Sequence, residues 1–196
     1  MAKYHHGKLK DALLARASEV IRTEGVEGIS LSALARDIGV SETAPARHFK
    51  SRTDLLQTLA KTGYAQATRA VLGNLDAGPM ALPNRMGKAF VAWAKENPQL
   101  FATIMHPDVT RHADAELKAA LHDFMVAIKT AITSAQAAGW RTDSDPELLF
   151  HYALAGIRGL AANASDPLFQ DVAGELSDQD IEAVIDLMLP KDNSGE

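Results

Sequence analysis

The chain has 196 residues, of which 46% are hydrophobic and 23% are charged, and its formal net charge is -5. This apolar fraction excludes an intrinsically disordered chain, and the length suits one domain or two small ones. The absence of cysteine excludes a disulfide framework, thiolate metal ligands and a cysteine nucleophile.

The net charge is unevenly distributed along the chain. Residues 1–69 hold 11 Lys and Arg against 7 Asp and Glu, whereas residues 70–196 hold 9 against 18. A basic first third favours contact with a polyanion, although ordinary scatter of surface charge accounts for the split equally well. No segment of about 20 residues is apolar and uncharged, so we expect no membrane span. Arg16 and Glu19 interrupt the apolar stretch that a secretion signal needs, which favours a cytoplasmic protein.

The first elements predicted along the chain are helices with short connections. Apolar residues repeat at helical spacing from Leu9 to Ile21, and Gly25 supplies a stop. Ser30 can cap a short helix that ends at Gly39, and Ser41 can cap a second short helix directly afterwards. Two short helices joined by a glycine turn form a helix-turn-helix. A longer helix follows over about residues 53–72.

Glycine and proline gather in residues 73–84, which we interpret as a linker. Beyond it, apolar periodicity and capping residues predict helices near 82–96, 98–105, 113–138, 146–164 and 178–189. Alternating strand patterns are nearly absent. The sequence therefore predicts an all-α fold of about nine helices. Its expected divisions are a helix-turn-helix domain over 1–52, a connecting helix over 53–72 and a second helical domain over 73–196.

The segment over residues 30–52 carries the sharpest functional signal. A helix-turn-helix lays its second helix in the DNA major groove, where polar side chains near the helix start reach base edges. The candidates at this start are Ser41 as the capping residue, with Glu42, Thr43 and Arg47 as readers of bases. Further candidates are better placed for the phosphate backbone, namely Ser32, His48, Lys50 and Arg52.

Residues 8–67 resemble the DNA-binding domain of TetR-type (TetR/AcrR) transcriptional regulators. The resemblance rests on Gly39-Val40-Ser41, His48-Phe49, Arg52 and Leu55-Leu56. The segments Tyr4–Gly7 and Ala44-Pro45 are similar to a subgroup whose C-terminal domain carries a Trp-His-Gly signature. This chain departs from the family pattern at Ala46, where an aromatic residue is usual, and from the subgroup signature at Arg158.

The resemblance implies a C-terminal domain that binds a small effector and forms a homodimer. Apolar residues on successive helices either line the effector cavity or simply fill the core, and the candidates are Phe90, Trp93, Phe101, Met105, Phe124, Ile128 and Tyr152. For the dimer, which in the family is a bundle of the last two long helices, the candidates are Gly156, Gly159, Ile185 and Met188. A symmetric dimer would bind a near-palindromic DNA operator.

Catalytic and metal-binding motifs are lacking in the sequence, so we expect no enzymatic activity, no cofactor and no metal. The function that the resemblance implies is a transcriptional repressor that leaves its operator when an unidentified small molecule binds. An alternative stays open because Pro45 and Ala46 are unusual in the second short helix. In that alternative the chain is a ligand-binding or interaction protein with a degenerate helix-turn-helix and little DNA affinity.

Overall fold

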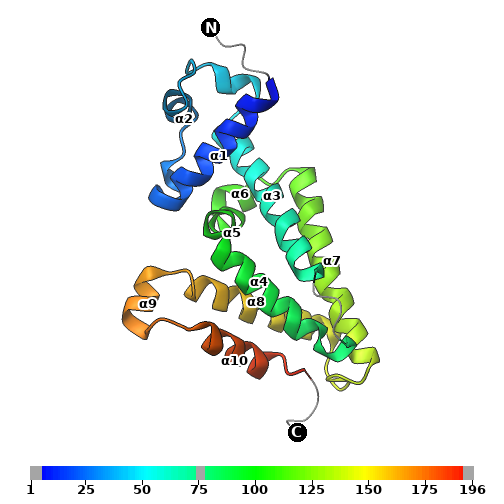
Figure 1. Ribbon diagram of the computed structural model, residues 1–196. Coiled ribbons are helices and arrows are strands. Elements are labelled where there is room, and N and C mark those ends of the chain that lie inside the picture. The colour runs from blue at the N-terminus through cyan, green and yellow to red at the C-terminus, as the bar shows by residue number, and fades with distance from the viewer. Residues whose placement is uncertain (1–5, 74–77, 192–196) are drawn as a thin grey trace. The chain divides into compact units, whose positions relative to one another are not determined.

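The computed structural model describes residues 6–73 and 78–191, and all regular structure in these ranges is helical (Figure 1). Ten α-helices occur there: α1 (His6–Glu24), α2 (Leu31–Asp37), α3 (Arg52–Leu72), α4 (Leu82–Glu96), α5 (Pro98–Met105), α6 (Pro107–Arg111), α7 (Ala115–Ala137), α8 (Pro146–Asn163), α9 (Pro167–Ala173) and α10 (Asp178–Met188). Three short 3-10 helices accompany them: η1 (Val26–Gly28), η2 (Ala44–Arg47) and η3 (Pro79–Ala81). The predicted all-helical fold is confirmed. None of the described helices is long and apolar enough to cross a membrane.

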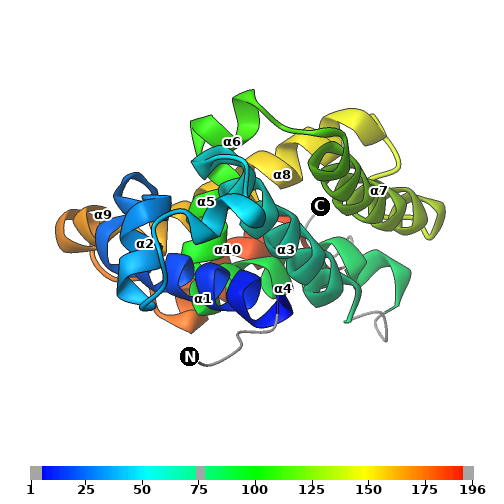
Figure 2. The same cartoon turned by 90° about the horizontal axis from the view of Figure 1, so that it is seen from above.

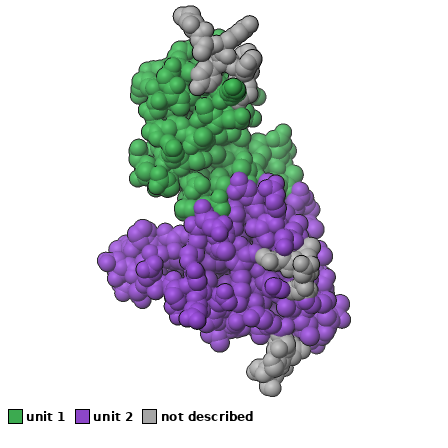
Figure 3. Space-filling view, viewed as in Figure 1, with its two compact units in different colours: residues 1–64, 97–120 green, residues 65–96, 121–196 purple. Residues whose placement is uncertain are grey.

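The chain divides into two compact units (Figure 3). The first unit holds residues 1–64 and 97–120, and the second holds residues 65–96 and 121–196. The helix-turn-helix segment therefore shares its unit with α5, α6 and the start of α7. The helices α3 and α7 each contribute residues to both units.

The first unit is built around α1, which packs against α2, η1, η2 and α5. Figure 1 and the rotated view in Figure 2 both place α2 beside α1. Leu13 and Ala17 are completely buried at helical spacing, as the apolar pattern predicts. The helix ends at Gly25, whose φ of 77° favours glycine and whose N–H donates to the carbonyl of Ile21. Phe49, 1% exposed, belongs to the same core.

The second unit is a layer of packed helices in which α4 contacts both α8 and α10. Local capping sets where these helices begin. The Asp145 carboxylate accepts from the backbone N–H groups of Glu147 and Leu148 at the start of α8. Ser177 and Asp180 form a reciprocal capping box at the start of α10. The fully buried Trp140 donates from Nε1 to the carbonyl oxygen of Pro190, which lies near the end of the chain.

Two short helices, α6 and α9, are absent from the predicted elements. The helix α6 begins after His106, whose ring Nδ1 accepts from the backbone N–H of Asp108. The helix α9 begins with Asp166 and Pro167, the same cap and first-position pair that opens α8. The Asp166-Pro167 signal was available in the sequence. The His106 signal was not, because histidine is an uncommon helix cap.

Candidate functional site

The turn between α2 and η2 has the backbone geometry of a helix-turn-helix. Gly39 has a φ of 75°, and its N–H donates to the carbonyl of Arg36 at 3.0 Å. The N–H of Val40 then donates to the carbonyl of Ala35 at 3.0 Å. These two bonds end α2 and reverse the chain toward η2.

The second helix of this motif is a 3-10 turn rather than the α-helix capped by Ser41 that the sequence suggests. The Ser41 hydroxyl lies 3.3 Å from the Thr43 hydroxyl and caps no backbone N–H there. Pro45 explains the difference, since it has no N–H to donate to the Ser41 carbonyl in an α-helical bond. That carbonyl instead accepts from Ala44 at 2.9 Å, and the Pro45 carbonyl accepts from His48 at 2.8 Å.

The turn nevertheless presents most of the predicted DNA contacts to solvent. Pro45 is buried and anchors the turn, while Ala46, in place of the family's usual aromatic residue, is exposed. The exposed candidates are Ser41, Glu42, Thr43, Arg47 and Lys50. Two candidates are half-buried, Ser32 and His48. The predicted contacts of these residues with DNA stay predictions.

Arg36, at the end of α2, was not among the predicted site residues. Its Nη1 donates to Glu42 Oε1 at 2.9 Å, and both side chains are more than half exposed. The contact joins the two parts of the helix-turn-helix and neutralises a carboxylate that would otherwise repel phosphates. An exposed pair of this kind contributes little to stability, so its effect is on the orientation of Glu42.

The guanidinium of Arg52, which the sequence predicts to contact phosphate, lies in a network inside the first unit. Nη1 donates to Asp108 Oδ2 at 2.8 Å, and Nη2 donates to the carbonyl oxygen of Val26 at 2.8 Å. Nε donates to the carbonyl of Ile29 at 3.2 Å, and Nη2 also lies 3.3 Å from Glu27 Oε2. All three guanidinium nitrogens are thus used to join η1, α3 and α6.

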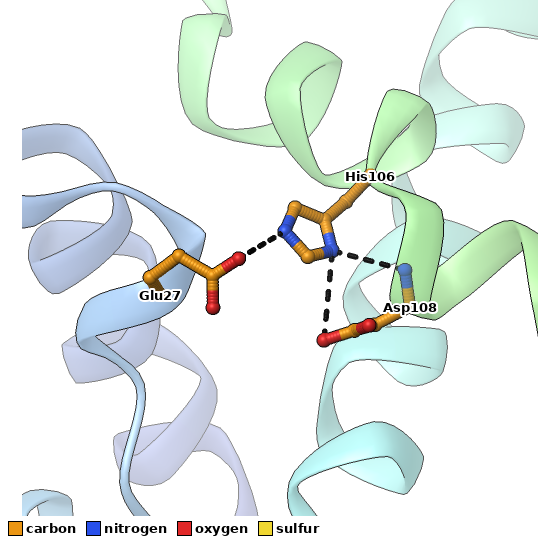
Figure 4. Close-up of side chains that lie close together, drawn as sticks. All are labelled: Glu27, His106 and Asp108. Carbon is orange, nitrogen blue, oxygen red and sulfur yellow. Dashed lines mark hydrogen bonds and ion pairs between the residues drawn. The ribbon is translucent and has the colours of Figure 1, made fainter.

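His106 joins two residues that contact Arg52, and Figure 4 shows its ring between Glu27 and Asp108. Its Nδ1 accepts from the backbone N–H of Asp108 at 3.2 Å, so the proton of the neutral ring is on Nε2. Nε2 then donates to Glu27 Oε1 at 3.0 Å. The hydrogen bond from Arg52 lowers the pKa of the Asp108 carboxyl below its ordinary value. We call Glu27, Arg52, His106 and Asp108 the Arg52 network.

Three groups of this network have the spacing of metal ligands. One atom each from Glu27, His106 and Asp108 lies within 4.8 Å of the others. Arg52, however, already pairs with both carboxylates. A divalent ion at this position would have to displace the guanidinium, so the arrangement favours a structural ion-pair network.

The second unit contains a small apolar slot with a cavity volume of about 40 Å³. It lies among α4, α7 and α8, and its lining is Val71, Pro83, Met86, Gly87, Phe90, Phe124, Ile128, Ala131, Ile132, Ala153, Leu154, Ile157, Arg158 and Leu189. Three predicted ligand-binding residues, Phe90, Phe124 and Ile128, therefore come together in its wall. The Phe90 and Phe124 rings pack at a centroid distance of 5.6 Å.

Four other predicted ligand-binding residues are not in this wall. Trp93 is buried beside Phe90 with ring centroids 5.6 Å apart, but it does not line the slot. Phe101 and Met105 lie on α5 in the first unit. Tyr152 is 48% exposed, and Arg141 stacks over its ring. Helical periodicity identifies apolar faces, but it does not distinguish a residue that lines the slot from one that packs elsewhere in the core.

The predicted dimer residues differ in exposure, and only some of them lie at the surface of the chain. Ile185 is fully buried within its own subunit, which corrects its assignment to a partner surface. A Cβ on Gly156 would lie 2.7 Å from Met188 Sδ of the same chain, so these two residues contact each other. Gly159 is exposed with open space above it. Large apolar side chains are exposed on α7, α8 and α10, namely Val126, Leu148 and Leu187.

The helix-turn-helix with its exposed polar turn, followed by a helical unit with an apolar slot, defines a DNA-binding transcriptional regulator. Residues 13–59 match the family model described as "Bacterial regulatory proteins, tetR family". Residues 84–189 match the model described as "Tetracyclin repressor-like, C-terminal domain". The chain belongs to the TetR family.

Solved structures agree with this assignment. A protein of unknown function from Rhodococcus sp. RHA1 is 31% identical, with a TM-score of 0.78, over 96% of this chain and 97% of that one. The TetR family regulator PfmR from Thermus thermophilus is 18% identical, with a TM-score of 0.69, over 90% and 96%. FadR from Bacillus subtilis, solved with stearoyl-CoA, is 14% identical, with a TM-score of 0.73, over 93% and 99%. The last two likenesses concern the fold alone. Among curated proteins, none matches this chain in sequence.

Proposed function

We propose that this protein is a homodimeric transcriptional repressor that leaves a near-palindromic operator when a small effector enters the apolar slot. The observation that supports the proposal is that one chain carries both this slot and a helix-turn-helix whose polar residues are exposed. The proposed DNA-binding domain spans residues 1–52 with α3 as its connection, and the effector and dimer domain spans 73–196.

The slot is linked to the DNA-binding segment through the chain itself. Met86 and Phe90 place α4 in the slot wall, and α5 begins at Pro98, two residues after α4 ends at Glu96. The next connection, between α5 and α6, carries His106 and leads to Asp108 of the Arg52 network. An effector that displaces α4 can therefore pull on residues bonded to η1 and to the start of α3.

Release requires that the effector bind the DNA-free conformation better than the DNA-bound one. A coupling free energy of roughly 1–3 kcal/mol is typical for allosteric proteins. The Arg52 network supplies bonds that one conformation can keep and the other lose, since it joins Glu27 and Arg52 of the first family match to His106 and Asp108 of the second.

The test is a mobility-shift titration of the full chain with DNA from upstream of its own gene. Specific, salt-sensitive binding that is reversed by an effector supports a repressor, and light scattering at micromolar concentration should give a dimer. The short 3-10 turn and the exposed Ala46 favour one competing function, a ligand-binding protein with little DNA affinity. Absence of DNA binding at low ionic strength would establish that second function instead.

A further inference from the structure

The ion pair between Arg36 and Glu42 lies in the part of the helix-turn-helix that meets the bases of DNA. Arg36 belongs to the last turn of α2, and Glu42 lies two residues before η2 begins. In this motif the start of the second helix reaches the base edges. The bond of 2.9 Å from Arg36 Nη1 to Glu42 Oε1 therefore places a guanidinium beside a residue at that position.

The backbone on both sides of the pair is held by hydrogen bonds and packing. The carbonyl of Arg36 accepts from the N–H of Gly39 at 3.0 Å, which fixes the end of α2. After Glu42 comes η2, which contains the buried Pro45 and packs against α1 and α2. Side chains on such a support lose less conformational freedom when they bind a ligand.

The pair uses only part of its hydrogen-bonding capacity. In the described part of the chain, its one bond engages Nη1 of Arg36 and Oε1 of Glu42, so Nη2, Nε and Oε2 have no protein partner. Asp37, next to Arg36 in sequence, does not compete for the guanidinium, because its Oδ2 accepts from Arg16 Nε at 2.8 Å. The side chains of Arg36 and Glu42 are 61% and 55% exposed. The pair thus offers unused donors and an unused acceptor to solvent.

A C·G base pair presents the complementary pattern in the major groove. Cytosine offers its N4 amino group as a donor, and guanine offers O6 and N7 as acceptors. Glu42 Oε2 can accept from N4, and the unused donors of Arg36 can bond O6 and N7. A T·A pair has the acceptor O4 of thymine in place of the cytosine amino group, so it would face the carboxylate with a second acceptor.

We propose that Arg36 and Glu42 act as one unit that reads a single C·G base pair in each half of the operator. Arg36 contacts the guanine and also holds the carboxylate of Glu42 toward the cytosine. Because the pair is electrically neutral, it adds sequence discrimination without adding to the attraction for phosphates. This inference rests on the proposed function, since it requires that the helix-turn-helix bind DNA.

The test selects binding sites from random duplex DNA with the full chain. Each selected half-site should contain one C·G pair whose replacement by T·A weakens binding at least about fivefold. Arg36→Met keeps much of the side-chain length but no donors, and it should remove this preference, as should Glu42→Ala. The double variant should lose no more discrimination than either single variant, because all three variants break the same contact.

Arg22→Met, at an exposed position on α1, is the matched control and should leave the selected site unchanged. All variants should retain the wild-type circular dichroism, because an exposed ion pair contributes little to stability. A uniform loss of affinity across all sequences in Arg36→Met would indicate a phosphate contact and overturn the proposal. Loss of two different base preferences in Arg36→Met and Glu42→Ala would overturn it as well.

The same selection separates this inference from the proposed function. A selected site in which no base pair depends on both Arg36 and Glu42 contradicts the shared reading and leaves the regulator supported. Failure of the wild-type chain to select any sequence, even at low ionic strength, contradicts both.

Discussion

Replacing Arg52 by lysine tests whether this side chain holds the first unit together or contacts DNA. The substitution keeps the positive charge but replaces three donor nitrogens, spread over a planar fork, by one ammonium group. The fork reaches Asp108 Oδ2 and the carbonyl oxygens of Val26 and Ile29 at 2.8, 2.8 and 3.2 Å. A single Nζ cannot reach all three acceptors.

The expected loss of stability follows from these contacts. If lysine keeps the pairing with Asp108, two carbonyl groups lose a charged donor, and each such bond is worth about 1.5–3 kcal/mol. The Val26 carbonyl still accepts from Ile29 N–H at 3.3 Å, and the partly exposed site admits water, so the loss is reduced. We expect Arg52→Lys to lower the free energy of unfolding by about 2 kcal/mol.

Urea unfolding followed by circular dichroism measures this change, at one fixed protein concentration because dimerisation would affect stability. Arg47→Lys is the matched control, since Arg47 is exposed and should change stability by less than about 0.5 kcal/mol. The reasoning is refuted if Arg52→Lys is as stable as the wild type. Weakened DNA binding at wild-type stability would restore Arg52 as a phosphate contact.

Three further substitutions test the turn over residues 41–50, which carries the predicted DNA contacts, and the second unit. Arg47→Ala should reduce the discrimination between operator and random DNA by about 1–3 kcal/mol, and equal losses on both would indicate a phosphate contact. Lys50→Ala should weaken binding to every sequence and flatten the salt dependence by about one unit, so an unchanged slope would place Lys50 off the DNA. Asn84 and Lys88 lower the pKa of Asp186 from 3.8 to about 2, so its ionised form stabilises the fold above pH 3.8. Because Asp186 is 43% exposed, Asp186→Asn should cost only about 1 kcal/mol at pH 7, and the difference in thermal unfolding should disappear as the pH falls toward 2.

Helix boundaries were predictable where the signal is local. Proline at the first position starts both α5, at Pro98, and α8, at Pro146, because it acts on the first turn of its own helix. The Asp145 side chain also caps α8, whereas the Asn97 side chain accepts no capping bond at the start of α5. The distortion at Pro45 was foreseeable on the same grounds, since the loss of its N–H is intrinsic to the residue.

Contacts between distant segments were not predictable in this way. Arg52 lies 26 residues from Val26 and 56 from Asp108, so no spacing rule indicates that it turns inward. The slot was only partly anticipated for a related reason. Periodicity shows which faces of α4 and α7 are buried, but it does not show where the packing of those faces leaves an opening.

The ion pairs change how the uneven charge of the chain relates to DNA binding. Residues 1–69 hold 11 basic against 7 acidic side chains, but several of these cations are committed to internal pairs. The pairs are Arg16 with Glu19 and Asp37, Arg36 with Glu42, Arg52 with Glu27 and Asp108, and Lys61 with Asp114 and Glu116. Among the residues that the structure describes, Arg47 and Lys50 form no ion pair and remain available to phosphates or bases.

Each phosphate neutralised by a protein cation adds about 0.9 to the salt dependence of DNA binding. A single subunit has few unpaired cations in the turn over residues 41–50. It should therefore bind DNA weakly and with a shallow salt dependence. Two subunits on one near-palindromic operator double the number of contacts. On this argument the affinity of the proposed repressor depends on the dimer, and a variant held as a monomer should show about half the salt slope of the wild type.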